Sequence, residues 1–427
     1  MNVLVVMADH FRFDALGCVG NPVAHTPNLD RLASQSVRFD RCYTQSPVCA
    51  AARHSLATGL YAHAQGVTRN SGMPLPGLRT IAHAVGPLGY RRFQLGHMHW
   101  KDRSMDTGYE PEATKGWKQT LPEEVQEVHK VLHPYLIRNT TAGPGVLTEK
   151  QHWGHFVAGQ TIRLLEEAVE KQQPFLCWTA FTEPHPPFRP PAEFYRLIDP
   201  AKVPLPAQAP ADAPPVHPYV ADARRDWTHL TEWELRQTIA AYYGMVALAD
   251  HYIGQVLDAV DRLGLRDQTA IFFTSDHGDQ LWEHEVFMKY MMYEGSTHVP
   301  LMVSVPGAPA AVRDEFVEHI DLFPTICELA GAQPPGPVHG RSLLPLVRGG
   351  PAPTDWRDAI FSQINIIKMI RTTDWKLVVH GEAPGELYDL RNDPQEFHNR
   401  LDDPACGPVV KQLEGRLWEW YRAHEPA

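Results

Sequence analysis

Two long apolar runs in the sequence each end directly in an acidic residue. Residues 2–8 are rich in valine and lead into Asp9, and residues 270–275 lead into Asp276. Continuous apolar runs of this length are typical of parallel strands that are buried on both faces of a sheet. We therefore expect two strands of one sheet, with both carboxylates at its carboxyl edge, where open α/β sheets bind their ligands.

Helical patterns lie between these two strands. Residues 26–35 begin with Thr-Pro, a common helix start, and residues 153–171 carry a long amphipathic repeat. Residues 175–181 and 301–305 are further candidates for buried strands. Strands that alternate with helices predict an α/β fold with a mostly parallel sheet that is covered by helices on both faces.

The segment from residue 184 to residue 218 is roughly one-third proline. Proline lacks an amide donor and fixes its own backbone angle, so this density excludes a long helix or a central strand. We expect an irregular excursion over the surface. Long ordered excursions of this kind often form the wall of a site.

The pattern changes after residue 350. Two short strands and a closing helix are indicated there, at residues 359–370, 375–380 and 409–424. We therefore expect a catalytic α/β domain over residues 1–350 and a small C-terminal α+β subdomain over residues 351–427.

The charge and composition of the chain exclude several classes of partner. Its 427 residues have a formal net charge of -11, which gives no basic footprint for nucleic acid and repels an anionic membrane. A local cluster of cations or a metal ion must therefore attract any anionic substrate. Six cysteines without a CxxC pair indicate reduced thiols. Because the first apolar run lacks the features of an export signal, we expect a cytoplasmic protein.

Each of the two strand-end carboxylates is followed by a histidine. Asp9 precedes His10, and Asp276 precedes His277. Carboxylates with imidazoles can bind one divalent cation of the Mg²⁺, Ca²⁺ or Mn²⁺ type, and the two histidines favour Mn²⁺. The alternative is that Asp9 caps a turn and that residues 275–279 form only a tight loop. Spacing alone does not decide between these interpretations.

Cys49 immediately precedes a helical segment, residues 50–58, that is closed by Gly59. The free N–H groups at a helix start favour an anion there, either a thiolate or a bound oxyanion. Arg53 follows one turn later and could hold Cys49 or the charge of a substrate. A lone cysteine is more often part of a buried core, so this motif needs support from the rest of the chain.

Four further residues stand in suggestive settings. His97 and His99 lie two positions apart, so in an extended segment both side chains could point into one pocket. His185 lies in a Pro-His-Pro-Pro motif, and Lys289 follows Asp276 closely enough to neutralise charge on a transferred group. Taken singly, each histidine is more often structural and the lysine is more often solvated.

Together, these segments resemble the sulfatase branch of the alkaline phosphatase superfamily over nearly the whole chain. The resemblance implies an alkaline phosphatase-like three-layer sandwich. It also implies a metal-dependent hydrolase of small sulfate esters, of the arylsulfatase, choline sulfatase or phosphonate monoester hydrolase type. The matching segments, which occur in the order of the family, are residues 2–9, 26–32, 49–59, 95–100, 184–187, 274–279, 319–325 and 385–394.

The resemblance assigns roles to the candidate residues. Cys49 matches the cysteine that the family oxidises to formylglycine, whose hydrated aldehyde supplies a hydroxyl group as nucleophile. The positions of the ligands for one divalent ion, Mn²⁺ or Ca²⁺, are Asp9, His10, Asp276 and His277. The other matching positions are Arg53, which would stabilise the hydrate, His99 near the nucleophile, His185 as a leaving-group contact or general acid, Lys289 on the oxyanion, and Asn70 and His97 on the substrate side.

The sequence departs from the family pattern at the nucleophile. The usual maturation motif is Cys-x-Pro-x-Arg, whereas this chain has Cys49-Ala50-Ala51-Ala52-Arg53. This form is similar to sites that are read by the radical, anaerobic type of sulfatase-maturing enzyme rather than by the oxygen-dependent formylglycine-generating enzyme. Many sulfatases also have aspartate and asparagine at the places of His10 and His277.

Three functional interpretations follow from the resemblance. His97 replaces a lysine of typical sulfatases, which weakens the sulfatase interpretation. A phosphodiesterase or phosphonate monoester hydrolase tolerates that replacement and commonly shares Asn70. The third is a catalytically degenerate, metal-binding homologue in which Cys49 stays a thiol. The leaving group is not readable, although residues 101–148 and the proline-rich excursion are expected to shape its pocket. Related enzymes often assemble through C-terminal segments, so a homo-oligomer is one option, but the sequence leaves the oligomeric state open.

Overall fold

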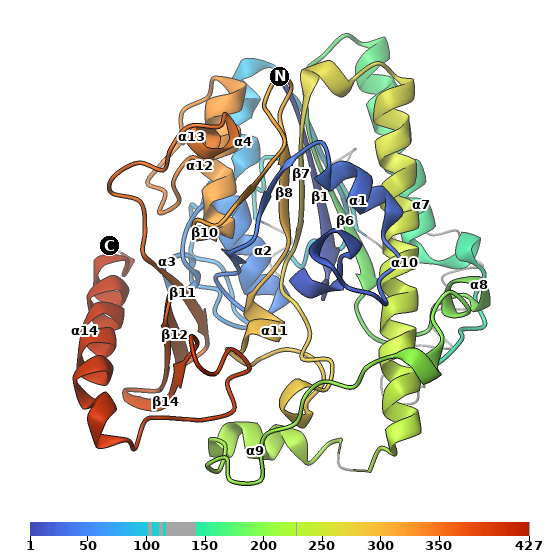
Figure 1. Cartoon of the computed structure of the whole chain (residues 1–427). Coiled ribbons are helices and arrows are strands. Elements are labelled where there is room, and N and C mark those ends of the chain that lie inside the picture. Colours follow the sequence, from blue (N-terminus) through green and yellow to red (C-terminus); the bar gives the residue numbers. More distant parts are fainter. Residues whose placement is uncertain (101–104, 111–113, 117–141, 228, 427) are drawn as a thin grey trace.

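The centre of the fold is a mixed, mostly parallel sheet (Figure 1). The computed structural model describes residues 1–100, 105–110, 114–116, 142–227 and 229–426. Within these ranges five neighbouring strands, from β5 to β7 in the spatial order given next, run parallel. Strand β8 is antiparallel to both of its neighbours, β7 and β2. In spatial order the eight strands are β5 (Thr114–Gly116), β4 (Arg91–Gly96), β6 (Phe175–Pro184), β1 (Asn2–Asp9), β7 (Thr269–Ser275), β8 (Leu301–Ser304), β2 (Val37–Phe39) and β9 (Ala311–Arg313).

Strand β1 lies in the middle of this sheet, and all of its residues are buried. Its side chains alternate between the two faces, as the pleat of a strand requires. Leu4, Val6 and Ala8 belong to one hydrophobic core, and Val3 and Val5 belong to the other. The uninterrupted apolar run in the sequence therefore reflects two cores, one on each side of the sheet.

Helices cover both faces of the sheet, so the molecule has three layers, and the three-layer α/β architecture expected from the sequence is confirmed (Figure 1). The helices predicted at residues 26–35 and 153–171 are present on the first face. None of the described helices is long and apolar enough to cross a membrane. The first face carries α1 (Pro27–Ala33), α7 (Trp153–Glu170) and α10 (Glu232–Arg262), and the second carries α2 (Cys49–Thr58), α4 (Ile81–Val85) and α12 (Leu322–Ala330).

A separate antiparallel sheet follows near the C-terminus and packs against one helix. The single strand expected at residues 359–370 is wrong, because the chain reverses at Asn365 and Ile366 to form a hairpin. Asn365 has φ 51, a left-handed conformation that asparagine tolerates in turns. The elements are β11 (Ala359–Ile364), β12 (Ile367–Thr372), β13 (Trp375–His380), β14 (Ala383–Asp389) and α14 (Gly407–Ala423).

Short elements connect the larger ones. The proline-rich segment is mostly irregular but contains a short helix, which the sequence interpretation omitted, and another helix begins at its last proline. The parallel pair β3 and β10 forms a second small sheet. The bounds are α3 (Ala62–Gln65), α8 (Ala192–Tyr195), α9 (Pro218–Arg224), α11 (Glu294–Thr297), α13 (Leu344–Val347), β3 (Cys42–Tyr43) and β10 (Val317–Glu318).

The packing of α14 against the C-terminal sheet can be tested by truncating one side chain. Leu417 is fully buried in the core that α14 shares with this sheet. We expect Leu417→Ala to lower the free energy of unfolding by about 2–5 kcal/mol, because it leaves a cavity. Ile366, in the hairpin turn of the same sheet, is 58% exposed. Ile366→Ala is therefore expected to change the free energy of unfolding by less than about 0.5 kcal/mol. Urea denaturation measures the free energy of unfolding of both variants. An equal decrease in the two variants would contradict the packing of α14 against the sheet.

Candidate active site

Strands β1 and β7 bring two acidic residues together at the carboxyl edge of the sheet. The strands are paired in register, with Ala8 opposite Ser275, so Asp9 and Asp276 follow at neighbouring positions. Both carboxylates are fully buried. The backbone N–H of Asp276 donates to the carbonyl oxygen of Ala8 at 3.3 Å, which holds the two strand ends side by side.

Arg53 of α2 links the two carboxylates. Its side chain is fully buried, with Nε 2.8 Å from Oδ2 of Asp276 and Nη2 2.9 Å from Oδ2 of Asp9. Burial and the charge of Asp276 raise the pKa of Asp9. The pKa of Asp276 is lowered, because Arg53 and His277 outweigh the effect of its own burial. Arg53 therefore pairs with the predicted metal ligands rather than with Cys49.

Hydrogen bonds fix the tautomers of His10 and His277. Nδ1 of His10 lies 2.8 Å from Oδ2 of Asp279, and Nδ1 of His277 lies 2.8 Å from the carbonyl oxygen of Gly278. Each Nδ1–H donates to these acceptors, which leaves the lone pair on Nε2. Burial lowers the pKa of His10 well below its usual value and that of His277 to about 4. Both rings are thus neutral near pH 7, the form that binds metal ions.

These donors form one cluster that fits a divalent metal ion. Ligand atoms of Asp9, Cys49, Asp276 and His277 all lie within 4.8 Å of one another, and so do those of Asp9, His10, Cys49 and His185. Because Asp9 and Cys49 belong to both sets, the sets surround one place. Carboxylate oxygens combined with neutral imidazole nitrogens suit a borderline ion such as Mn²⁺.

Cys49 is the first residue of α2 and is fully buried at the centre of this cluster. Its Sγ lies 2.8 Å from Nζ of Lys289, 3.1 Å from Nε2 of His277 and 3.5 Å from Oδ1 of Asp9. The helix start favours a thiolate, but burial and the charge of Asp9 raise the pKa of this thiol well above its usual value. Without an ion, Cys49 is therefore a neutral thiol.

Lys289 and His185 lie beside this cluster. Nζ of Lys289 is 2.7 Å from Nε2 of His10 as well as close to Cys49. Burial lowers the pKa of Lys289, but the charges of Asp9 and Asp276 raise it by more, so Lys289 is protonated. The ring of His185 meets the ring of His10 edge-on at 4.5 Å. Burial lowers the pKa of His185 to about 3, so this ring is neutral.

The remaining predicted residues, His97, His99 and Asn70, contact other parts of the site. His97 directly follows β4 and has Nε2 4.0 Å from Oδ2 of Asp9. His99 contacts His97, with Nδ1 2.9 Å from Nε2 of His97. Oδ1 of Asn70 accepts from the backbone N–H of Ala50 at 3.0 Å, so Asn70 holds the first turn of α2. All three are partly exposed and form the rim of the cluster.

Two supporting residues were missed by the sequence interpretation. Asp279 is fully buried and orients His10, while its other oxygen accepts from the N–H groups of Leu281 and Met288. Its place in the strand-end loop after Asp276 was a usable signal. The hydroxyl of Tyr242 in α10 donates to the carbonyl oxygen of His10 at 3.0 Å. No signal marked Tyr242, because it lies within the apolar stretch of a long helix.

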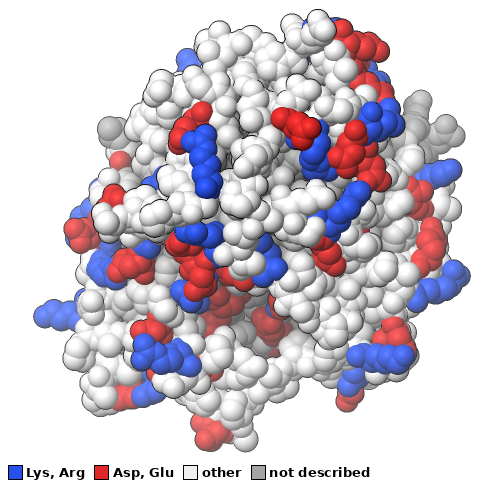
Figure 2. Space-filling view, turned by 45° about the horizontal axis from the view of Figure 1, so that its top comes forward, with Lys and Arg blue, Asp and Glu red and all other residues white. Residues whose placement is uncertain are grey.

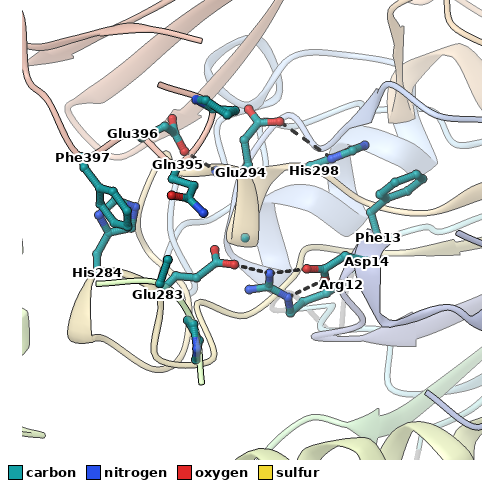
Figure 3. A pocket seen from close by; sticks show the side chains of 14 residues that line it. Arg12, Phe13, Asp14, Glu283, His284, Glu294, His298, Gln395, Glu396 and Phe397 are labelled. Carbon is teal, nitrogen blue, oxygen red and sulfur yellow. Dashed lines mark hydrogen bonds and ion pairs between the residues drawn. The ribbon is translucent and has the colours of Figure 1, made fainter. Parts of the chain in front are cut away.

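A pocket of about 190 Å³ lies beside the cluster, between the loops after β1 and β7 and residues 394–397 (Figure 3). None of the predicted site residues lines it. Arg12 extends into it from the loop after β1 and pairs with Asp14 at 2.6 Å and Glu283 at 2.5 Å. Glu294 and Glu396 add two more carboxylates. Acidic side chains also gather around a hollow on the face shown in Figure 2. The expected role of residues 101–148 lies largely outside the described residues.

Profiles of two protein families match the chain. The family described as Sulfatase matches residues 1–332. The family described as N-sulphoglucosamine sulphohydrolase, C-terminal, matches residues 282–423. The first match alone spans well over half of the chain, and together the two matches reach from the first residue to the last turn of α14.

Individual proteins and solved structures agree with these matches. A choline-sulfatase of Rhizobium meliloti (strain 1021) is 29% identical, over 96% of this chain and 83% of the relative. An arylsulfatase of Clostridium perfringens (strain 13 / Type A) is 28% identical, over 97% and 95%. The crystal structure of a phosphonate monoester hydrolase of Agrobacterium radiobacter superposes with a TM-score of 0.86 at 29% identity, over 99% of this chain and 96% of that one.

The order of the motifs, the three-layer sheet with its C-terminal sheet, and these matches lead to one assignment. The resemblance and the fold expected from the sequence are confirmed. The chain belongs to the sulfatase family, a family of generally metal-dependent ester hydrolases within the alkaline phosphatase superfamily.

Proposed function

We propose that the chain hydrolyses small sulfate esters with the help of one divalent metal ion and of residue 49 as the nucleophile. The observation that carries this proposal is the convergence of Asp9, Asp276 and His277 on Cys49, with the Lys289 ammonium group 2.8 Å from its Sγ. The site of a hydrolase needs a nucleophile, a Lewis acid and a cation for the transferred group. This cluster offers residue 49 as the nucleophile, candidate ligands for a metal ion as the Lewis acid, and Lys289 as the cation. The choline-sulfatase and arylsulfatase names of the relatives support the substrate class.

Four residues would hold the metal ion. Asp9 and Asp276 supply carboxylate oxygens, and His10 and His277 turn unprotonated Nε2 atoms toward the same place. Two imidazoles favour Mn²⁺ over Ca²⁺. When bound, the ion supplies a Lewis acid that polarises the ester and stabilises negative charge. Asp279 supports this site from behind, because it fixes the ring of His10.

The protonation state of Cys49 supports maturation. A buried neutral thiol is a weak nucleophile, and burial raises the pKa of Cys49 well above its usual value. Formylglycine at this position would supply a hydrated aldehyde with a hydroxyl group as nucleophile. Because Sγ is fully buried, a maturing enzyme must act before the chain folds around it. The three alanines after Cys49 leave the radical type of maturing enzyme as the proposed partner.

The local charges indicate a monoanionic ester. Lys289 is protonated and contacts Cys49, whereas Arg53 is already paired with two carboxylates. The rings of His185 and His277 are neutral near pH 7, because burial lowers their pKa values to about 3 and about 4. Beside the ion, Lys289 therefore adds a single cationic contact for the ester, which suits a singly charged sulfate ester better than a doubly charged phosphate monoester.

A second candidate function is the hydrolysis of phosphonate monoesters or phosphodiesters, which also carry one negative charge. The similarity to the phosphonate monoester hydrolase favours it, as does His97 in place of the usual sulfatase lysine. Asn70 and the Asp-His pairs fit both functions. The catalytically degenerate homologue with an unmodified Cys49 is the third candidate, and the experiments below separate it from the other two. The domain boundary near residue 350 stays a prediction, and the oligomeric state stays open.

Conversion of Cys49 can be tested by mass. We expect the intact chain, produced together with a radical maturing enzyme, to be lighter by about 18 Da, because sulfur is exchanged for oxygen and two hydrogens are lost. Cys49→Ala should abolish this loss and lower turnover by more than about 10³-fold. Cys327, also buried but in α12, provides the matched control, and Cys327→Ala should keep both. An active Cys49→Ala variant would refute the nucleophile, and an unmodified, inactive wild-type chain would support the degenerate homologue.

Metal dependence can be tested by chelation and by thermal unfolding. We expect a chelator to abolish turnover and Mn²⁺ to restore it. Mn²⁺ at about 100 times its Kd should stabilise the folded chain by about 2.7 kcal/mol. Asp276→Asn should remove both effects, because it removes a ligand charge. Asp250 is equally buried but accepts hydrogen bonds from the start of α1, so Asp250→Asn should keep both. Activity that survives complete chelation would remove the ion from the mechanism.

The charge of the preferred substrate can be tested with four chromogenic esters that share one leaving group. We expect kcat/KM for the aryl sulfate, aryl phosphonate monoester and aryl phosphodiester to exceed kcat/KM for the aryl phosphate monoester. The order among the first three then ranks the sulfatase against the phosphonate monoester hydrolase. A clear preference for the phosphate monoester would show that the site carries more positive charge than proposed.

A further inference from the structure

A second group of metal-type ligands lies outside the active site, where α9 meets the C-terminal sheet. His217 directly precedes α9, His380 ends β13, and Glu386 lies in β14. One ligand atom from each residue lies within 4.8 Å of the others. Figure 1 shows α9 beside the end of this sheet. The three residues share no member with the Asp9 cluster, so sulfatase chemistry does not account for them.

The imidazole rings of two members of this group stack on each other. The rings of His217 and His380 stack with centroids 3.7 Å apart and an angle of 21°. Gly385 makes this possible, because a Cβ at that position would lie 2.5 Å from Cδ2 of His380 and 3.2 Å from Cδ2 of His217. Any larger residue would displace the ring of His380. Glycine at this strand position therefore keeps both histidines beside Glu386.

Glu386 is anchored as an ionised carboxylate. Its side chain is buried, and Oε2 accepts hydrogen bonds from the hydroxyl groups of Tyr293 at 3.0 Å and Tyr388 at 2.8 Å. Oε1 lies 2.8 Å from Nε2 of His380. These hydrogen bonds hold the pKa of Glu386 below its usual value in spite of burial. Donors that fix the outer oxygen of a carboxylate, as the two tyrosines do, are typical of metal sites.

His217 presents a ring edge to the same place. Its Nδ1 accepts the backbone N–H of Tyr219 at 3.2 Å, at the start of α9. Its opposite edge faces the sheet, since Nε2 and Cδ2 lie nearest to Gly385. Burial and the facing His380 ring lower the pKa of His217, which is therefore neutral near pH 7. A neutral imidazole is the form that binds metal ions.

We propose that His217, His380 and Glu386 form a second divalent-metal site, of the zinc class, that ties α9 to the C-terminal sheet. Two imidazole nitrogens and one carboxylate oxygen are a ligand set that Zn²⁺ accepts in tetrahedral geometry. His217 and His380 are partly exposed, so a water molecule can take the fourth position. The histidine-rich set selects against Ca²⁺ and Mg²⁺, which prefer oxygen ligands.

Zinc binding requires a proton rearrangement. In the ion-free chain Nε2–H of His380 donates to Glu386, and Nε2 of His217 carries the proton because Nδ1 is an acceptor. To bind one ion through Nε2, both rings must move their protons to Nδ1, and one ring must turn out of the stack so that both lone pairs point at the ion. His217 then gives up its hydrogen bond from Tyr219. The start of α9 should therefore move when the ion binds, which gives a structural signature that is independent of activity.

The test is the number of zinc ions bound by the full-length chain in equilibrium dialysis against micromolar ZnCl₂, measured by elemental analysis. We expect His380→Ala to bind one zinc ion fewer per chain than the wild type, and its thermal unfolding to lose part of its shift with zinc. His217→Ala should lose the same ion. It serves as the second variant because His217 is partly exposed, so its replacement should leave the fold intact. Turnover saturated with Mn²⁺ should stay unchanged in both.

His251 provides a matched control. Its Nε2 also lies near a carboxylate, 3.5 Å from Oε1 of Glu149, but His251 belongs to none of the groups of metal-type ligands found among the described residues. His251→Ala should keep the wild-type number of zinc ions. The proposal is overturned if the wild type, His217→Ala and His380→Ala bind equal numbers of zinc ions. Because the count does not depend on turnover, this result is distinguishable from a failure of the proposed function.

Discussion

The active site depends on one electrostatic constraint, the burial of two carboxylates at the ends of neighbouring strands. Asp9 and Asp276 follow β1 and β7, and both are removed from water. Like charges repel strongly in such surroundings, and each also loses its hydration. Arg53 compensates by bonding to both carboxylates, at 2.9 Å and 2.8 Å. Because Arg53 lies one turn into α2, the same contacts place the first residue of that helix, Cys49, directly above the carboxylates.

This constraint also explains how an acidic protein can attract an anionic ester. The net charge of -11 repels anions at long range. Within the cluster, the protonated Lys289 and Arg53 offset the two carboxylates, and the buried histidines stay neutral. The charges of these four acidic and basic groups thus cancel before any ion binds. A divalent ion then adds the positive charge that an ester anion and its developing negative charge require.

Much of this arrangement could be predicted from the sequence, for physical reasons that differ between elements. Residues 2–8 predicted a central strand because two cores require apolar side chains on both faces, and α2 was predicted from its closing glycine. The hairpin at Asn365 was hidden because apolar residues continue through the turn. The role of Arg53 as a link between two carboxylates depends on contacts with residues 44 and 223 positions away, which no local pattern encodes. The contact of Tyr242 with His10 could not be predicted for the same reason, because the two residues lie far apart in the sequence.

The central claim is that Asp9, His10, Asp276 and His277 hold one ion beside residue 49. Crystals of the chain loaded with Mn²⁺, with diffraction recorded on both sides of the manganese absorption edge, test it most directly. The account predicts an anomalous peak among the carboxylate oxygens of Asp9 and Asp276 and the Nε2 atoms of His10 and His277, within contact distance of the side chain at position 49. A manganese peak elsewhere, with these four side chains unliganded and held only by Arg53 and Asp279, would contradict it.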